Sequence, residues 1–197
     1  MYGTVRTFVI EPSGSTRRDL RRFASGSQCP GGFSYHDARV PLDVVSSPDP
    51  RREITSADQD IVTRSDPRWP QACACGYLFR ESDTWQVFTE TLYRRAGDAD
   101  SPAWGLSKVP AGALWRATWM EDDAGWRGPD GCAWVVKLPD GRDWMIDGPA
   151  VDHKTEPPTI TWHAWTRHGT APLFTVTPSI LTPKYHGFLT DGELRPC

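Results

Sequence analysis

The sequence predicts a mainly β protein: a single antiparallel β-rich domain of sandwich or roll type, with a short N-terminal helix and a long irregular arm. Eight of the ten tryptophans lie between Trp104 and Trp165, on short segments in which apolar residues alternate with polar ones. Turns that contain Gly or Pro separate these segments. Because alternation places large side chains on one face of a strand, we expect most tryptophans in a covered sheet face.

The Trp-rich stretch divides into several expected strands. Apolar residues alternate on both sides of Pro139-Asp140-Gly141, a pattern typical of a β-hairpin. Trp104 and Trp126 lie in loops, so these two are the tryptophans expected at the surface, where they would suit a protein interface or base stacking. The strands are expected at residues 114–120, 134–138, 144–146 and 159–165.

The N-terminal part predicts a strand at residues 4–10 followed by a helix at 16–25. Leu20 and Phe23 are spaced to pack on one side of this helix. Its arginines would then face outward. They could contact phosphate or an acidic partner, but a solvated face is favoured because the whole chain has a net charge of −3. These arginines are Arg17, Arg18, Arg21 and Arg22.

Residues 26–70 consist mostly of Ser, Pro, Gly, Asp and Arg, with only brief apolar pieces. Such a segment indicates an extended arm that lies over a neighbour, or a poorly ordered connection. We therefore divide the chain into residues 1–70, which hold the first strand, the helix and the arm, and residues 71–197, which form the Trp-rich β domain.

Two further elements are expected in the second part. Alternation from Trp85 to Tyr93 favours a strand at 84–94, although a helix with a Glu90–Arg94 pair is the alternative. A strand at 173–177 then precedes a closing hairpin, whose turn is Thr190-Asp191-Gly192.

Composition and motifs exclude several classes of protein. The net charge of −3 and a pI near 5.9 argue against a surface that coats nucleic acid. No apolar run approaches the roughly 20 residues that span a bilayer, and the N-terminus lacks the apolar core of a secretory signal. Motifs of phosphate loops, dinucleotide sites, metalloproteases, esterases and zinc deaminases are absent. We expect a soluble protein with no membrane partner.

The cysteines predict a metal site. Their odd number, five, and irregular spacing favour free thiols or metal ligands over a disulfide framework. In Cys73-Ala74-Cys75-Gly76, two thiolates can converge across a tight turn, and the glycine lets main-chain amides point at sulfur. A structural zinc needs four ligands, and His153 and His163 flank the strand after the hairpin. We predict a structural Zn²⁺ on Cys73, Cys75, His153 and His163, with two packed free thiols as the alternative.

An ordered series of motifs runs through the second part of the chain. The pattern comprises CxCGYxF, WQ(x)nYRR, PGAxW, GPDG, PxGxWxIDG, WxRHG and YHGFLxxG, which this sequence supplies at 73–79, 85–95, 110–115, 128–131, 139–148, 165–169 and 185–192. In these motifs the chain resembles an uncharacterised family of small proteins from tailed phages and prophages. Related members carry further cysteines where this sequence has His153 and His163. If the family binds zinc there, the two histidines substitute for thiolates.

The resemblance implies a setting but no defined catalytic activity. We predict a phage-type accessory protein that binds a protein partner of host or phage origin, in the host cytoplasm or incorporated in the virion. One alternative is a structural or accessory component of the capsid or tail, which the irregular arm suggests. The other is a zinc-dependent hydrolase or nucleic-acid-modifying enzyme, which requires an open coordination position beside a carboxylate. Nucleic acid is not an expected partner, and the oligomeric state stays open.

Overall fold

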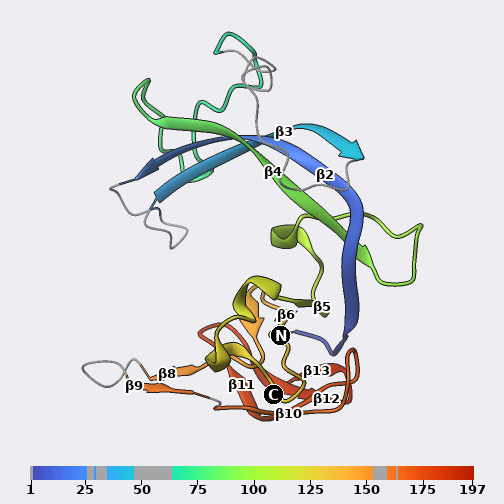
Figure 1. The fold of residues 1–197 in the computed structure, drawn as a ribbon. Helices are drawn as coiled ribbons and strands as arrows, with labels where there is room; N and C mark the ends of the chain where they lie inside the picture. Colours follow the sequence, from blue (N-terminus) through green and yellow to red (C-terminus); the bar gives the residue numbers. More distant parts are fainter. Residues whose placement is uncertain (1, 26–28, 30–34, 47–63, 153–158, 163) are drawn as a thin grey trace. The chain divides into compact units, whose positions relative to one another are not determined.

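The computed structural model describes residues 2–25, 29, 35–46, 64–152, 159–162 and 164–197 (Figure 1). The helical segments in these ranges are the short 3₁₀ turns η1 (Leu106–Lys108), η2 (Thr118–Met120) and η3 (Ala124–Trp126). The rest of the secondary structure is β, which confirms the predicted mainly β class. The strands are β1 (Val5–Arg6), β2 (Phe8–Ser25), β3 (Tyr35–Ser46), β4 (Thr84–Arg95), β5 (Ala113–Arg116), β6 (Trp134–Lys137), β7 (Asp143–Met145), β8 (Ala150–Asp152), β9 (Thr159–Thr161), β10 (Thr166–His168), β11 (Thr175–Leu181), β12 (His186–Thr190) and β13 (Glu193–Pro196).

The chain separates into two compact units. Unit 1 comprises Met1–Glu11 and Arg94–Cys197, and unit 2 comprises Pro12–Tyr93. Both boundaries fall inside strands, in β2 and near the end of β4.

Unit 1 contains two groups of strands and a separate pair. The first group is a sheet with the order β1-β13-β12-β11-β10, in which all neighbours are antiparallel. The second joins β5, β6 and β7 in antiparallel order, and the start of β2 adds to β5 in parallel at Phe8 and Val9. β8 and β9 form the separate antiparallel pair.

One hydrophobic cluster packs the two sheets of unit 1 against each other. The indole of Trp134 meets the ring of Phe174 edge-on at 5.3 Å between centroids, and Trp144 meets Trp165 in the same way at 5.2 Å. Burial of large apolar side chains from both sheets supplies the main stabilisation of the unit, at about 1.5–3 kcal/mol for each fully buried side chain. The buried members are Leu114, Val136, Leu138, Ile146, Phe174, Val176, Ile180, Tyr185, Leu189 and Leu194.

The exposed tryptophans are not the two expected from the sequence. Trp104 and Trp126 are half-buried, whereas Trp119 and Trp162 are 60% and 48% exposed. Trp162 packs edge-on against the Trp126 ring, at 6.1 Å between centroids, and so covers part of it. The chain at Gly148 also lies close to the ring, since a Cβ built there would stand only 3.0 Å from it. Position in a loop was therefore a poor guide to exposure.

Unit 2 is built on a long antiparallel ribbon of β2 and β3. Its paired positions run from Ser15 opposite Ser46 to Ser25 opposite Tyr35, and β4 also pairs with β2. Two small apolar clusters accompany the ribbon, and the second of them includes two cysteines. The buried members of the first are Leu20, Trp69 and Val87, and those of the second are Ala24, Cys29, Cys73 and Phe79.

The predicted helix at 16–25 is wrong, because these residues belong to β2. Leu20, Arg22 and Ala24 are buried in alternation, which is the period of a strand. Arg22 is only 5% exposed, and its guanidinium donates to the carbonyl oxygens of Pro70 and Arg80. A buried arginine looks like a solvated residue in a hydrophobicity pattern, so the true period was hidden.

The predicted irregular arm is wrong between residues 35 and 46, where β3 forms. Pro41 sits opposite Asp19, next to an irregularity in the register between Arg18 and Asp19. A bulge of this kind tolerates a proline inside a strand, whereas the sequence pattern argues against one. The arm residues 26–28, 30–34 and 47–63 lie outside the described residues.

Most other predicted strands are confirmed. The central hairpin is β6 and β7, the segment 84–94 is β4, and the closing hairpin is β12 and β13. Its turn has positive φ at both Asp191 and Gly192, as a tight hairpin turn requires. Three predicted strands changed in extent: 114–120 is β5 followed by η2, the described residues of 159–165 include β9 at Thr159–Thr161, and 173–177 became β11.

Candidate metal centre

Four side chains of unit 2 form a cluster that could hold a metal ion. Their ligand atoms, three thiol sulfurs and one imidazole nitrogen, all lie within 4.8 Å of one another. They come from three parts of the chain: the connection after β2, strand β3 and the turn at residues 72–78. The four residues are Cys29, His36, Cys73 and Cys75.

The 72–78 turn places two of these thiols side by side. Ala72 pairs with Leu78 in an antiparallel bridge, and the N–H of Cys73 donates to the carbonyl of Tyr77 at 2.9 Å. The N–H of Gly76 donates back to the carbonyl of Cys73, also at 2.9 Å. Gly76 has a φ of +93°, a conformation that other residues rarely adopt. The sequence Cys-x-Cys-Gly therefore folds as the tight turn that its composition predicts.

His36 and Cys29 close the cluster from the other side. The imidazole is buried and stacks on the Tyr77 ring, with centroids 4.1 Å apart and an interplanar angle of 6°. Its Nδ1 lies 3.2 Å from the Sγ of Cys75, and the Sγ atoms of Cys29 and Cys73 are 4.0 Å apart. The stacking restrains the plane of the ring, and in this orientation Nδ1 faces the Cys75 thiol.

These distances suit tetrahedral coordination. A metal about 2.3 Å from sulfur and about 2.0–2.1 Å from nitrogen sets sulfurs about 3.8 Å apart and a sulfur about 3.5 Å from a nitrogen. The two distances of 4.0 and 3.2 Å differ from these by a few tenths of an ångström. The other pairs of donor atoms lie within 4.8 Å, so side-chain shifts of up to about 1 Å would bring all four donors onto one ion. Thiolate and imidazole donors together are typical of zinc.

The electrostatics of the cluster also favour a cation. A hydrogen bond from the main-chain N–H of Cys75 lowers the pKa of Cys73 to about 6. At Cys75 the main-chain N–H of Tyr77 acts to lower the pKa, but loss of water and the sulfurs of Cys73 and Cys29 outweigh it and raise the pKa. Thiolates this close repel one another, and a divalent cation would remove that repulsion.

The structure brings together only part of the predicted ligand set. Cys73 and Cys75 lie together as expected, and His153 and His163 lie outside the described residues. Cys29 and His36 are partners that the sequence interpretation missed. A signal was present, because a cysteine and a histidine seven positions apart precede the Cys-x-Cys turn. His153 and His163 were preferred because they flank the strand expected after the hairpin.

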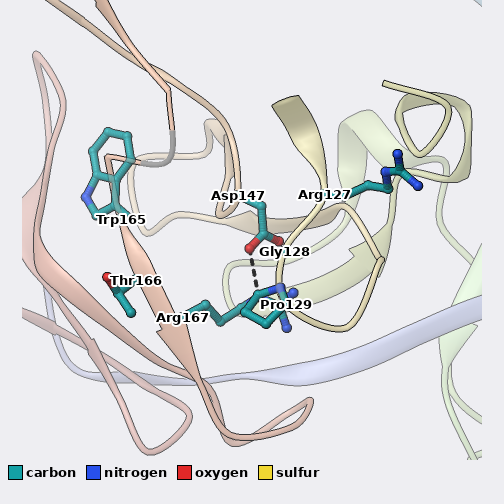
Figure 2. A pocket seen from close by; sticks show the side chains of 7 residues that line it. All are labelled: Arg127, Gly128, Pro129, Asp147, Trp165, Thr166 and Arg167. Atoms are coloured by element: carbon teal, nitrogen blue, oxygen red, sulfur yellow. Dashed lines mark hydrogen bonds and ion pairs between the residues drawn. The ribbon is translucent and has the colours of Figure 1, made fainter. Parts of the chain in front are cut away.

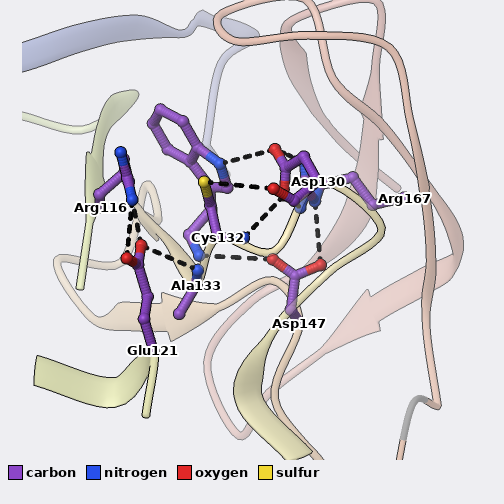
Figure 3. Close-up of polar contacts among 8 residues, drawn as sticks. Arg116, Glu121, Asp130, Cys132, Ala133, Asp147 and Arg167 are labelled. Carbon is purple, nitrogen blue, oxygen red and sulfur yellow. Dashed lines mark hydrogen bonds and ion pairs between the residues drawn. The ribbon is translucent and has the colours of Figure 1, made fainter. Parts of the chain in front are cut away.

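A second cluster of charged residues lies in unit 1 (Figure 3). The guanidinium of Arg167 donates to both carboxylate oxygens of Asp130, at 3.1 and 2.7 Å, and its Nε donates to Asp147 at 2.9 Å. Asp147 also accepts the N–H of Trp134 at 3.3 Å. Hydrogen bonding to Arg167 lowers the pKa of Asp130 to about 2, whereas burial raises the pKa of Asp147. We refer to these three side chains as the Arg167 triad.

An open cleft of about 340 Å³ lies beside the triad (Figure 2). The side chains of Asp147 and Arg167 are only 5% and 3% exposed, and their polar atoms are already engaged with each other. A Cβ at Gly128 would stand 2.0 Å from Arg167 and 2.3 Å from Asp147, so the loop is packed tightly onto the pair. The triad therefore fastens three segments of unit 1 and offers no free acid or base. The cleft is lined by Arg127, Gly128, Pro129, Asp147, Trp165, Thr166 and Arg167.

Fold and site together define a mainly β protein with a three-cysteine, one-histidine cluster as its candidate metal centre. The described residues include no helical segment with the length and hydrophobicity of a membrane span. No protein-family model, no curated protein and no solved structure matches the chain. The likeness to phage proteins therefore depends on the sequence motifs alone.

Proposed function

We propose that this chain is a zinc-stabilised binding protein in which the metal has a structural role. The observation that carries the proposal is the convergence of four protein donors from three segments of unit 2 within 4.8 Å. Four protein ligands complete the tetrahedron of a zinc ion, whereas a catalytic zinc keeps a position open for water or substrate. The geometry thus favours a structural site over the hydrolase alternative.

The metal would compensate for the small core around it. The buried cluster near the site contains Ala24, Phe79 and two of the cysteines, which is little apolar surface for holding three segments together. Zinc that bridges Cys29, His36 and the 72–78 turn would crosslink those segments. Its binding free energy would then contribute directly to the folding free energy of unit 2.

Exposed aromatic side chains in unit 1 support protein binding as the activity. Trp162 is 48% exposed while its ring packs on Trp126, and Ile160 is 53% exposed two residues earlier. Trp119 is 60% exposed. Tryptophan is the residue type most enriched among the energetically dominant contacts of protein interfaces. The phage setting, a host or phage partner, and a place in the host cytoplasm or the virion come from the motif resemblance.

Metal content in matched variants tests the proposal. We expect about one zinc per chain by inductively coupled plasma mass spectrometry on untagged protein, as one tetrahedral site requires. The substitution His36→Ala removes a donor that the structure assigns, so its zinc content should fall well below that of the wild type. The double variant His153→Ala, His163→Ala removes the donors suggested by the sequence and should keep its zinc. Zinc loss in the double variant alone, or no zinc in the wild type, would overturn the assignment.

A further inference from the structure

We propose that Cys75 is an oxidation site for hydroperoxides, and that the resulting disulfide between Cys75 and Cys29 expels the metal. This inference rests on the proposed zinc site and adds a chemical reaction to it. The cluster holds three thiols within 4.8 Å of one another, and a thiol, unlike a histidine, can be oxidised to a disulfide.

Exposure selects the sulfur that reacts first. Cys29 and Cys73 are buried, at 9% and 7% exposure, whereas Cys75 is exposed at the outer side of the 72–78 turn. Ala74 and Gly76 on either side of it are exposed as well. Cys75 is therefore the cysteine of the cluster that a peroxide in solvent reaches most readily, while Cys29 and Cys73 are screened by the protein. The reactive form is the thiolate, which metal coordination maintains.

Proximity selects the sulfur that completes the reaction. The Sγ of Cys29 lies within 4.8 Å of the Sγ of Cys75, so modest side-chain rotation brings the two into bonding range. Cys73 is as near, but only one residue separates it from Cys75, and a disulfide there would have to close across the tight turn that Gly76 maintains. Cys29 comes from a different segment and carries no such constraint.

The reaction balances with a hydroperoxide as the oxidant. The Cys75 thiolate attacks the terminal oxygen, the O–O bond breaks, and the alkoxide leaving group takes a proton, which gives a sulfenic acid and an alcohol. The Cys29 thiolate then attacks the Cys75 sulfur, the S–O bond breaks, and the hydroxide takes a second proton to leave as water. The two sulfurs lose two electrons in total. His36 and Cys73 alone remain as donors, too few to hold a structural zinc.

Zinc release and peptide mapping together test the inference. The variant background Cys132→Ser, Cys197→Ser removes the two cysteines outside the cluster. In that background, hydrogen peroxide should release about one zinc per chain to a chromophoric chelator, with loss of two thiols. Trypsin should then yield peptide 23–39, which contains Cys29, joined to peptide 69–80, which contains Cys73 and Cys75. Fragmentation should place the bond at Cys75, and a thiol reductant with added zinc should restore the starting state.

A second variant removes the reactive sulfur and keeps four donors. Cys75→His is expected to bind zinc and to release it at least 10-fold more slowly under the same peroxide treatment. Release at the wild-type rate, an internal disulfide in peptide 69–80 alone, or a bond to Cys73 would overturn the inference. Wild-type protein that holds zinc but forms no such crosslink would refute only this inference. Protein that forms the crosslink but never holds zinc would refute the proposed function and the release of metal, and would leave only the oxidation of Cys75 and Cys29 to a disulfide.

Discussion

Gly76 is the single residue on which the 72–78 turn depends. Its φ is +93°, and no described heavy atom lies within 4 Å of the position that a Cβ would occupy. A side chain at this position is therefore opposed by backbone strain alone, at roughly 1–2 kcal/mol. Gly76→Ala should weaken zinc binding by about 10-fold, measured by competition with a chelator of known affinity.

Gly97→Ala provides the matched control for that variant. Gly97 lies in unit 1, has a φ of +74°, and also has an open Cβ position. Its substitution should cost similar stability and leave the zinc affinity unchanged. Equal affinities in the two variants and the wild type would contradict the place of the 72–78 turn in the metal centre.

Two of the four residues in the metal cluster could be predicted from the sequence, and two could not. The pair Cys73 and Cys75 was predictable because the two thiols and the glycine are adjacent in sequence, so local geometry fixes them. Cys29 and His36 were not, because strand pairing between β2 and β3 brings them to the turn. The spacing of Cys29 and His36 alone does not show that they meet the 72–78 turn, because that contact arises only in the tertiary structure.

At the scale of elements, regular alternation made the strands of unit 1 predictable. Trp134, Val136 and Leu138 fall on one face before the turn and Trp144 and Ile146 on one face after it, and the structure has a hairpin there. In β2 the alternation includes Arg22, and β3 contains Pro41 at an irregular pairing. A buried cation and a proline in a bulge both break the usual pattern, so these two strands were predicted as a helix and an arm.

The Arg167 triad joins three sequence motifs. Their order along the chain was known from the sequence, but their contact in space was not. Asp130 belongs to the GPDG loop, Asp147 follows β7, and Arg167 lies on β10. Three separate motifs therefore meet in one group of charges. Arg167 and Asp147 are buried, so removing either one would leave an uncompensated buried charge and destabilise unit 1.

The lowered pKa of Asp130 gives the triad a signature in the acid range. In the folded protein this pKa is about 2, below the ordinary value of 3.8, so between these values the unfolded chain binds more protons. The stability from the Asp130 contact is therefore present above about pH 4 and lost as the pH falls toward 2. Asp130→Asn should flatten the pH dependence of urea unfolding across this window.

Asp147 has the opposite effect on the pH dependence of stability, and it is present in both the wild type and the Asp130→Asn variant. Burial raises the pKa of Asp147. Its contribution to stability is therefore fully present below the ordinary aspartate pKa and declines as the pH rises through the raised pKa. The comparison of wild type with Asp130→Asn therefore reports the Asp130 contact together with a smaller change at Asp147, whose pKa the Asp130 charge also raises. An unchanged slope between pH 4 and 2 would show that the ion pair with Arg167 does not form in solution.

For the whole molecule, the division into two units separates the two proposed roles. The metal cluster lies entirely in unit 2, and the exposed tryptophans lie in unit 1. The mainly β class followed from alternation in the Trp-rich part of the chain. The division did not, because its boundaries fall inside the strands β2 and β4.

Zinc K-edge X-ray absorption spectroscopy on the purified, untagged protein tests directly whether three cysteines and one histidine bind one zinc ion. We expect three sulfur ligands at about 2.3 Å and one nitrogen ligand at about 2.0–2.1 Å, with outer-shell scattering from one imidazole. Two sulfurs with two imidazoles would instead favour the set Cys73, Cys75, His153 and His163. Two or fewer sulfurs with an oxygen ligand would indicate an open site and contradict the structural role of the metal.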